Sequence, residues 1–378
     1  MPRGFSLVEI MVAMVIGLIG MLVIFQSFDT FEAQKRTTTS STDAQESGLL
    51  ALNSIERDIR LSGYGLFYAN QLICNQMNQW NGSAVSQVPL MPIAATDGGS
   101  GSDTILTSYS TSAFGAMPAQ LLVNTATSNL TLQINNATRN AGFSLGNYIL
   151  VANPLRAQPC SRLQVSASTL APDGLSVALA TASGGTTPAN PPSATNLFPT
   201  APYVGYGNSP SEPSVVVNMG GFTRNQYSIS MNATTREGEL QVLDLTTTAA
   251  APLSIATGIV NLQVQYGVSA TATTQEINNW VNPTGSWAPA SISIADIGRV
   301  KAIRVAVVAR SSQSERTNVS GTCTTPTGTV NNGPCAWNDA GTTAAPAIDL
   351  SADPNWQQYR YRVYETIVPL RNVMWQTF

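Results

Sequence analysis

The chain has 378 residues, a net charge of −3 and only 10% charged side chains. This length is sufficient for the core of one large domain or two modest ones. The weak net charge gives no basic surface for nucleic acid or anionic lipid. Histidine is absent, which removes the usual general base and the commonest transition-metal ligand. We therefore expect no enzymatic activity, no cofactor, no metal site and no nucleic-acid partner.

The N-terminus reads MPRGFSLVEIMVAMVIGLIGMLVIF, and Glu9 is the single charged residue in an apolar run from Phe5 to Phe28. At about 1.5 Å per residue, a helix of this length crosses the roughly 30 Å hydrocarbon core of a bilayer. The run is longer than the apolar core of a signal peptide, and no cleavage site follows it. A charge inside a membrane span is costly, so Glu9 is a candidate functional residue. The alternative is a tolerated or protonated acid without a partner.

The helical pattern continues beyond the apolar run. No proline occurs from Phe5 to Gly65, and apolar residues recur at spacings of three and four: Leu49, Leu52, Ile55 and Ile59. These features predict one helix from Phe5 to Leu61, about 85 Å long. Its first half suits lipid and its second half suits docking on a folded domain. Three glycines are positions where it could curve or melt: Gly17, Gly20 and Gly48.

The four cysteines are Cys74, Cys160, Cys323 and Cys335. None forms a CxxC pair, and an even number beyond a membrane anchor is typical of disulfides in an oxidising compartment. Cys323 and Cys335 bracket a turn-rich loop, which favours pairing them and leaves Cys74 for Cys160. Four cysteines allow three connectivities, and four buried thiols are the alternative.

The remainder of the chain is predicted to be β. In IVNLQVQYGV (259–268), Val260, Leu262, Val264, Tyr266 and Val268 share one face and polar residues the other, which predicts a half-buried strand. The segments VKAIRVAVVAR (300–310) and YRVYETIVPL (361–370) are further strands. Shorter candidates are QLLV, LTLQI, YILVA, RLQVS, LSVALA, SVVVN, QYSISM and LQVLDL. We expect an antiparallel sheet packed on the second half of the helix.

Long polar stretches separate these strands. One of them holds Asp97 and Asp103 around a glycine-serine run, but two acids lack the ligand set of a calcium loop, so a plain turn is favoured. The tryptophans could include a sugar-binding platform, although we expect most to be core or loop anchors. The sequence leaves open what these loops bind.

Motifs at both ends of the chain carry a family resemblance. The string Gly4-Phe5-Ser6-Leu7-Val8-Glu9, after a short leader containing Arg3, resembles the processing site of type IV prepilins and pseudopilins. Two further segments are similar to PilW-type minor pilins and, more loosely, to the J-type pseudopilin of type II secretion. They are Glu56-Arg57-Asp58-Ile59-Arg60 with Gly63-Tyr64-Gly65, and Leu370-Arg371-Asn372.

The resemblance implies a processing and assembly role. A prepilin peptidase would cut after Gly4 and methylate the new amino terminus at Phe5. Glu9 would then meet the terminal amine of a neighbouring subunit as helices pack into a filament. The implied partners are this peptidase, other minor and major pilins, and a tip adhesin as a further candidate. Such a pair would stabilise the correct axial stagger between neighbouring subunits, because each charge offsets the desolvation cost of the other.

Together these expectations give an α+β fold in which a long pilin helix packs on a large antiparallel β-sheet domain with long loops. The expected units are residues 1–4 as leader, 5–28 as membrane span, 29–61 as periplasmic half of the helix and 62–378 as globular domain. Arg3 places the leader in the cytoplasm by the positive-inside rule. The favoured function is a minor pilin that initiates or caps a type IV pilus, first in the inner membrane and later at the cell surface near the pilus tip. The alternatives are a type II secretion pseudopilin and a membrane-tethered periplasmic binding protein.

Overall fold

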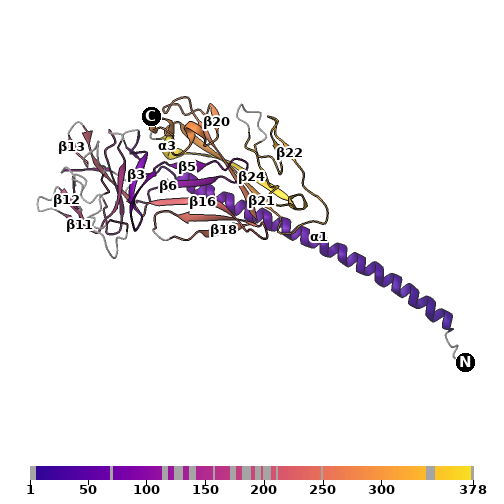
Figure 1. The fold of residues 1–378 in the computed structure, drawn as a ribbon. Coiled ribbons are helices and arrows are strands. Elements are labelled where there is room, and N and C mark those ends of the chain that lie inside the picture. Colours follow the sequence, from indigo (N-terminus) through magenta and orange to yellow (C-terminus); the bar gives the residue numbers. More distant parts are fainter. Residues whose placement is uncertain are drawn as a thin grey trace.

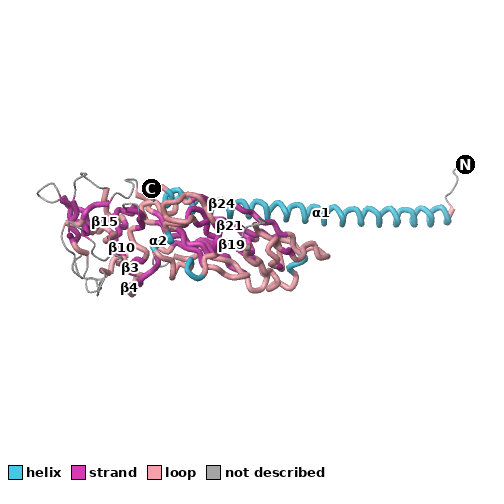
Figure 2. The backbone as a smooth tube through the Cα atoms, turned by 90° about the horizontal axis from the view of Figure 1, so that it is seen from above, coloured by secondary structure: helices cyan, strands magenta, loops and turns pink. Residues whose placement is uncertain are grey.

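The computed structural model confirms the α+β architecture and describes most of the chain. The described residues are 6–68, 71–112, 118–122, 131–135, 142–155, 158–170, 176–180, 189–191, 197–198, 206–209, 212–247, 250–337 and 345–375. A single long helix projects from one end of an elongated β domain (Figure 1). Seen from above, the second half of the helix lies along this domain and the first half extends beyond it (Figure 2).

The long helix α1 (Leu7–Leu61) has 55 residues and is continuous through all three glycines. Within the described residues it is the one helix long and apolar enough to cross a membrane. Its apolar first half is exposed and touches no part of the described domain; Leu18, for example, is 67% exposed. The predicted helix is thus confirmed from Leu7 onward, while Phe5 lies outside the described residues.

The docked half of α1 buries a narrower stripe than the sequence predicts. Leu52, Ile55 and Ile59 are buried as expected, but Leu49 is 51% exposed. A Cβ atom added at Gly48 would overlap the ring of Tyr364. Gly48 is therefore a point where the helix packs closely against the Tyr364 ring of β24, and Leu49, next to it in the helix, is turned toward solvent. The prediction that Gly48 is a place to curve or melt is wrong, because this glycine permits close packing instead.

A four-stranded antiparallel sheet carries this half of the helix. Its order is β20 (Asn279–Val281), β19 (Ile259–Val268), β21 (Val300–Arg310) and β24 (Tyr361–Pro369). Helix α1 contacts β24, β21 and β19. On β21 the side chains of Ile303, Val305 and Val307 join the core beneath the helix, as the alternation predicts.

The other face of this sheet is also covered, so the prediction of a half-buried β19 is wrong. All ten of its residues are buried. Loops supply the cover: Gln263 Nε2 donates to the Gly101 carbonyl at 2.6 Å, and Gln265 binds Asn282. A second apolar layer packs on β21, and its members are Ala336, Trp337, Ile348, Leu350 and Trp356. The polar side chains Gln263 and Gln265 of this alternating strand therefore face loops that supply hydrogen-bond partners, and not open solvent.

A β-bulge moves Val260 off its predicted face. The pairing of β19 with β21 shifts register between Ile259 and Asn261. Ile259 consequently joins the core under the helix, whereas Val260 joins the layer on the opposite face. An extra residue in one strand reverses the alternation on one side of the bulge.

Two further sheets build the rest of the domain. The five-stranded antiparallel sheet has the order β18 (Leu253–Thr257), β17 (Gly238–Asp244), β16 (Thr223–Met231), β6 (Thr104–Tyr109) and β5 (Ile93–Thr96). The six-stranded sheet has the order β4 (Val85–Pro89), β3 (Gln76–Trp80), β10 (Cys160–Gln164), β9 (Tyr148–Ala152), β15 (Val215–Gly220) and β7 (Pro118–Gln120). Only its β10–β3 pair is parallel among these described strands.

Short elements complete the described chain. A three-stranded sheet, β11 (Ala167–Leu170), β12 (Ser176–Ala180) and β8 (Thr131–Asn135), lies at the end farthest from the N-terminus (Figure 1). Two-stranded pairs are β1 (Phe67–Tyr68) with β2 (Gln71–Leu72), β13 (Asn208–Ser209) with β14 (Glu212–Pro213), and β22 (Cys323–Thr324) with β23 (Val330–Asn331). The short helices are α2 (Ile294–Ile297) and α3 (Arg371–Met374), with 3-10 turns at Gly285–Trp287 and Trp356–Gln358.

Candidate functional site

The start of α1 is closed by a reciprocal cap between Ser6 and Glu9. The Glu9 amide donates to Ser6 Oγ at 3.2 Å, and the Ser6 amide donates to Glu9 Oε2 at 3.0 Å. This capping box satisfies two N–H groups that the first turn of a helix leaves without partners. Gly4 and Phe5, the predicted processing residues, lie outside the described residues. Glu9 therefore has a partner within its own chain, which the sequence reading did not include.

The far end of the docked helix is fixed by a buried carboxylate. Asp58 is 7% exposed. It accepts hydrogen bonds from Tyr227 Oη at 2.8 Å, Asn225 Nδ2 at 2.7 Å and Tyr109 Oη at 3.2 Å. Burial, and then the Asp58 charge, raise the pKa of Tyr109 to about 12 and also raise that of Tyr227. These phenols stay protonated donors, and they join α1 to the five-stranded sheet.

The segment that ends α1 meets the C-terminal segment of the chain. Gly63 and Gly65 have φ values of 82° and 77°, a region that glycine adopts without strain. The turn they form lets the Gly63 amide donate to the Ser108 carbonyl at 2.9 Å. Asn372 Nδ2 donates to the carbonyls of Leu61 and Ser62, both at 3.1 Å. Two of the motifs that carry the resemblance are thus in contact, although more than 300 residues separate them.

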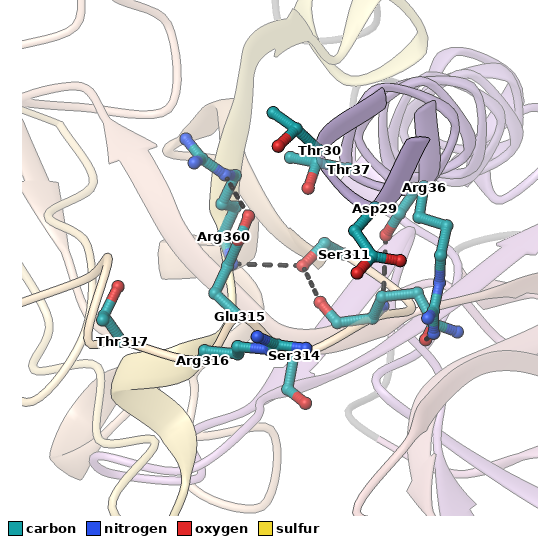
Figure 3. A pocket seen from close by; sticks show the side chains of 12 residues that line it. Asp29, Thr30, Arg36, Thr37, Ser311, Ser314, Glu315, Arg316, Thr317 and Arg360 are labelled. Atoms are coloured by element: carbon teal, nitrogen blue, oxygen red, sulfur yellow. Dashed lines mark hydrogen bonds and ion pairs between the residues drawn. The ribbon is translucent and has the colours of Figure 1, made fainter. Parts of the chain in front are cut away.

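A polar hollow lies where the helix leaves the domain. It has a volume of about 460 Å³ and lies between residues 29–40 of α1 and the loop that follows β21. Its charged lining residues are Asp29, Arg36, Glu315, Arg316 and Arg360, and hydroxyl side chains supply most of the remainder. Figure 3 shows Asp29 and Arg36 on the helix facing Glu315 and Arg316 on the loop. We call this cavity the basal hollow.

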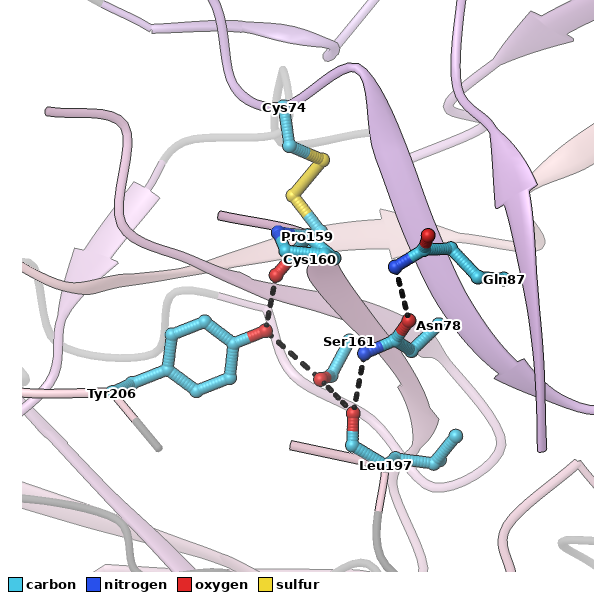
Figure 4. The surroundings of a disulfide bond; sticks show 8 residues. All are labelled: Cys74, Asn78, Gln87, Pro159, Cys160, Ser161, Leu197 and Tyr206. Atoms are coloured by element: carbon cyan, nitrogen blue, oxygen red, sulfur yellow. Dashed lines mark hydrogen bonds between the residues drawn. A yellow bond between two sulfur atoms is a disulfide. The ribbon is translucent and has the colours of Figure 1, made fainter. Parts of the chain in front are cut away.

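Both predicted disulfides are confirmed. Cys74 is bonded to Cys160 with a Cα–Cα distance of 5.9 Å, and Cys323 to Cys335 with 5.7 Å. The first bond joins the chain before β3 to the start of β10, beside hydrogen bonds that link Ser161 to Tyr206 and Leu197 (Figure 4). The second closes the loop that contains β22 and β23.

The acidic pair and two of the tryptophans have structural partners. Asp103 accepts from the Gly98 and Val264 amides, both at 2.8 Å, and so pins the glycine-rich loop against β19. Burial raises the pKa of Asp103 to about 7. Trp280 and Trp337 lie over the Arg304 guanidinium at 4.9 and 4.5 Å. Among the described residues no group of three or more metal-ligating side chains gathers.

Two family models match the chain. The type IV pilus-assembly protein W (PilW) model matches residues 226–372, and the prokaryotic N-terminal methylation motif matches residues 2–25. These matches confirm the resemblance to PilW-type minor pilins. A search of curated proteins and a search of solved structures found no match.

The matched regions correspond to the two ends of the site. The methylation motif covers the capping box and the exposed apolar part of α1, which fits inner-membrane anchoring with a soluble C-terminal domain. The PilW match begins within β16 and ends at Asn372, so it includes the four-stranded sheet and the residue that binds the end of α1. Both matches point to a structural pilin, not an enzyme.

Sequence reasoning missed the residues that hold the helix in place. In the sequence Asp58 is recognisable only as part of a family motif, and no pattern there distinguishes its partners Tyr109, Asn225 and Tyr227. A lone acid on the face of a helix that also carries buried Ile55 and Ile59 is a signal that could have found it, because a buried carboxylate requires donors. The basal hollow has no such signal, since its loop is polar and irregular.

Proposed function

We propose that this chain is a minor pilin that prepilin peptidase cleaves after Gly4, and that it initiates or caps a type IV pilus. The observation that carries the proposal is the continuity of α1. Its exposed apolar half bears the methylation motif, and its other half is fixed to the region that matches PilW. A helix that is exposed along one half and docked along the other suits a subunit that packs against other pilin helices.

The proposed organisation follows from that helix. Residues 1–4 are the leader, 5–28 the inner-membrane span, 29–61 the periplasmic part of the helix and 62–378 the globular domain. Prepilin peptidase acts first, while the chain is anchored in the inner membrane, and other minor and major pilins are the later partners. In the finished pilus this subunit lies near the tip at the cell surface.

Glu9 has two successive partners in this proposal. In the single chain its carboxylate accepts from the Ser6 amide at 3.0 Å, so the exposed acid is held at the helix start. During assembly the methylated amine at Phe5 of a neighbouring subunit replaces that amide as donor. The exchange is favourable because a buried amine without a counter-charge is strongly destabilising.

Two substitutions at Glu9 separate these roles. Glu9→Leu removes both the cap and the charge, whereas Glu9→Gln removes the charge and retains a side chain that completes a capping box. For both variants we expect unchanged membrane fractionation and an unchanged mature mass. Co-purification with other pilins should fall sharply for both, because breaking one side of a buried pair costs about 3–5 kcal/mol. Normal incorporation of the Gln variant would show that capping suffices, and would contradict the assembly contact.

The pilus assignment is tested separately from the contact. Deletion of the gene should abolish or sharply reduce piliation and leave secretion of exoproteins intact. Loss of secretion with normal piliation would instead identify a type II secretion pseudopilin.

A further inference from the structure

The basal hollow lies at the level of a membrane surface if α1 spans a bilayer, as in the proposed function. Asp29 directly follows Phe28, the last residue of the apolar run. Arg36 lies about 12 Å beyond Phe28 along the helix axis. Side chains on a helix, however, slant toward its N-terminus. The Arg36 side chain therefore leaves the helix inclined toward the lipid, and its guanidinium is held by Gln313 on the loop. A headgroup layer is about 5–7 Å thick on each side of the hydrocarbon core, so the mouth of the hollow falls within reach of headgroups.

Charges of both signs face this hollow. Arg36 donates to Gln313 Oε1 at 2.9 Å, and Arg360 donates to Glu315 at 3.0 Å. Within the described part of the chain, Arg316 and Asp29 have no hydrogen-bond or ion-pair partner. Figure 3 shows these side chains around a shared opening. One free cation and one free anion therefore remain at the same cavity.

The combination of charges selects among lipid chemistries. A purely anionic headgroup would meet Asp29 and Glu315 as well as the arginines, which is unfavourable. A choline headgroup offers a carboxylate no N–H donor. A headgroup that carries a phosphate and a primary ammonium matches both signs, since guanidinium binds phosphate and carboxylate accepts from ammonium. A volume of about 460 Å³ lies within the range of small-ligand sites.

We propose that the basal hollow binds the headgroup of a zwitterionic phospholipid with a primary amine, with Arg316 and Arg36 on its phosphate and Asp29 on its ammonium. This contact would hold the domain at a fixed height and rotation above the membrane before assembly. The proposal depends on the membrane span of the proposed function and adds a specific lipid to it.

Lipid retention by the full-length chain tests the site. The protein is reconstituted in nanodiscs that contain equal parts of phosphatidylethanolamine, phosphatidylcholine and phosphatidylglycerol, and bound lipid is then counted by native mass spectrometry after mild extraction. We expect phosphatidylethanolamine to be enriched over the other two. Arg316→Gln should lower its retention about five-fold, the effect of one basic residue at a lipid surface. Asp29→Asn should remove the preference for ethanolamine over choline. Arg371→Gln is the matched control, because this exposed arginine lies near the opposite end of the docked helix, and it should change nothing.

Several outcomes would overturn the proposal. Preferential retention of phosphatidylglycerol would show that the site selects negative charge alone. Inorganic phosphate or soluble glycerophosphoethanolamine could be retained by the protein as well as the lipid is. That result would show a site for free phosphate compounds. Unchanged lipid counts in Arg316→Gln with weaker co-purification of other pilins would make the hollow a protein interface. In each of these cases the chain still inserts, so the proposed function stands; failure to insert at all would contradict that function instead.

Discussion

Asn372 donates hydrogen bonds from its side-chain amide to the carbonyls of Leu61 and Ser62, where the long helix ends. The last carbonyls of a helix lack hydrogen-bond donors within the helix. Here Asn372, near the C-terminus of the chain, supplies the donors. The same segment follows β24, the strand that packs against α1. The contact therefore fixes the position of the helix end relative to the sheet.

Substitution of Asn372 tests the importance of this contact. Asn372→Ala removes two hydrogen bonds of about 1 kcal/mol each and should lower the free energy of unfolding by about 1–2 kcal/mol. Urea unfolding of the full-length chain in detergent measures the change. Arg371→Ala, at the exposed neighbouring position, should leave stability within about 0.5 kcal/mol. Equal stability of both variants would mean that the contact is not needed to hold the helix.

Asp58 should be the most sensitive residue of α1 outside the apolar stripe. Asp58→Ala leaves the donors of Tyr109 and Asn225 without this acceptor and leaves Tyr227 only the Ser54 carbonyl at 3.4 Å, and an unsatisfied buried donor costs about 1–3 kcal/mol. We expect a loss of at least about 2 kcal/mol, read from the same unfolding experiment. Glu56→Ala provides the comparison, because the Glu56–Arg60 pair is more exposed and should be worth less than about 1 kcal/mol. Similar losses for both would argue against a special role for the buried carboxylate.

Gly48 should tolerate no side chain without movement of its neighbour. In Gly48→Ala the new methyl group overlaps the ring of Tyr364, and overpacking of this kind costs about 1–3 kcal/mol. Gly20→Ala meets nothing within 4 Å and should favour the helix by up to about 1 kcal/mol. Opposite signs of the two changes in unfolding free energy are the expected result. A stabilising Gly48→Ala would show that the helix and β24 are farther apart than described.

Asp103 should make stability fall as the pH rises. Burial raises its pKa from 3.8 to about 7 in the folded chain, so the folded state binds this proton more tightly than the unfolded state. The contribution is fully present below about pH 4 and is lost as the pH rises through about 7. At about 1.4 kcal/mol per pKa unit the change is of the order of 4 kcal/mol. Asp103→Asn should flatten this part of the pH profile of unfolding, whereas Asp97→Asn should retain it; an unchanged slope in Asp103→Asn would assign it to other groups.

Periodicity in the sequence was sufficient for the elements that carry a regular apolar face. It predicted α1, β21 and β24, and the shorter predicted strands all overlap β7, β8, β9, β10, β12, β15, β16 or β17 within the described residues. It could not find β3, whose sequence QMNQW does not alternate and whose pairing with β10 links residues far apart. Such strands are determined by their neighbours in the sheet more than by their own composition.

Sequence patterns indicate a site only where its chemistry is local. Gly4, Phe5 and Glu9 form a compact motif whose role in processing and assembly stays a prediction, whereas the pairing indicated by the cysteines that bracket a loop is confirmed. The partners of Asp58 are 51 to 169 residues away in sequence, so no local pattern connects them to the helix. The loops that cover β19 follow the same rule, because their contacts form only after the sheet has assembled.

The mass of the mature N-terminus tests the central claim most directly. The full chain is purified from membranes, and its N-terminal peptide is analysed by mass spectrometry. The account predicts that the mature chain begins at Phe5, with a methylated amine, and that the peptide retains Glu9. A chain that retains Met1, or one cleaved after Phe28, would contradict processing as a prepilin.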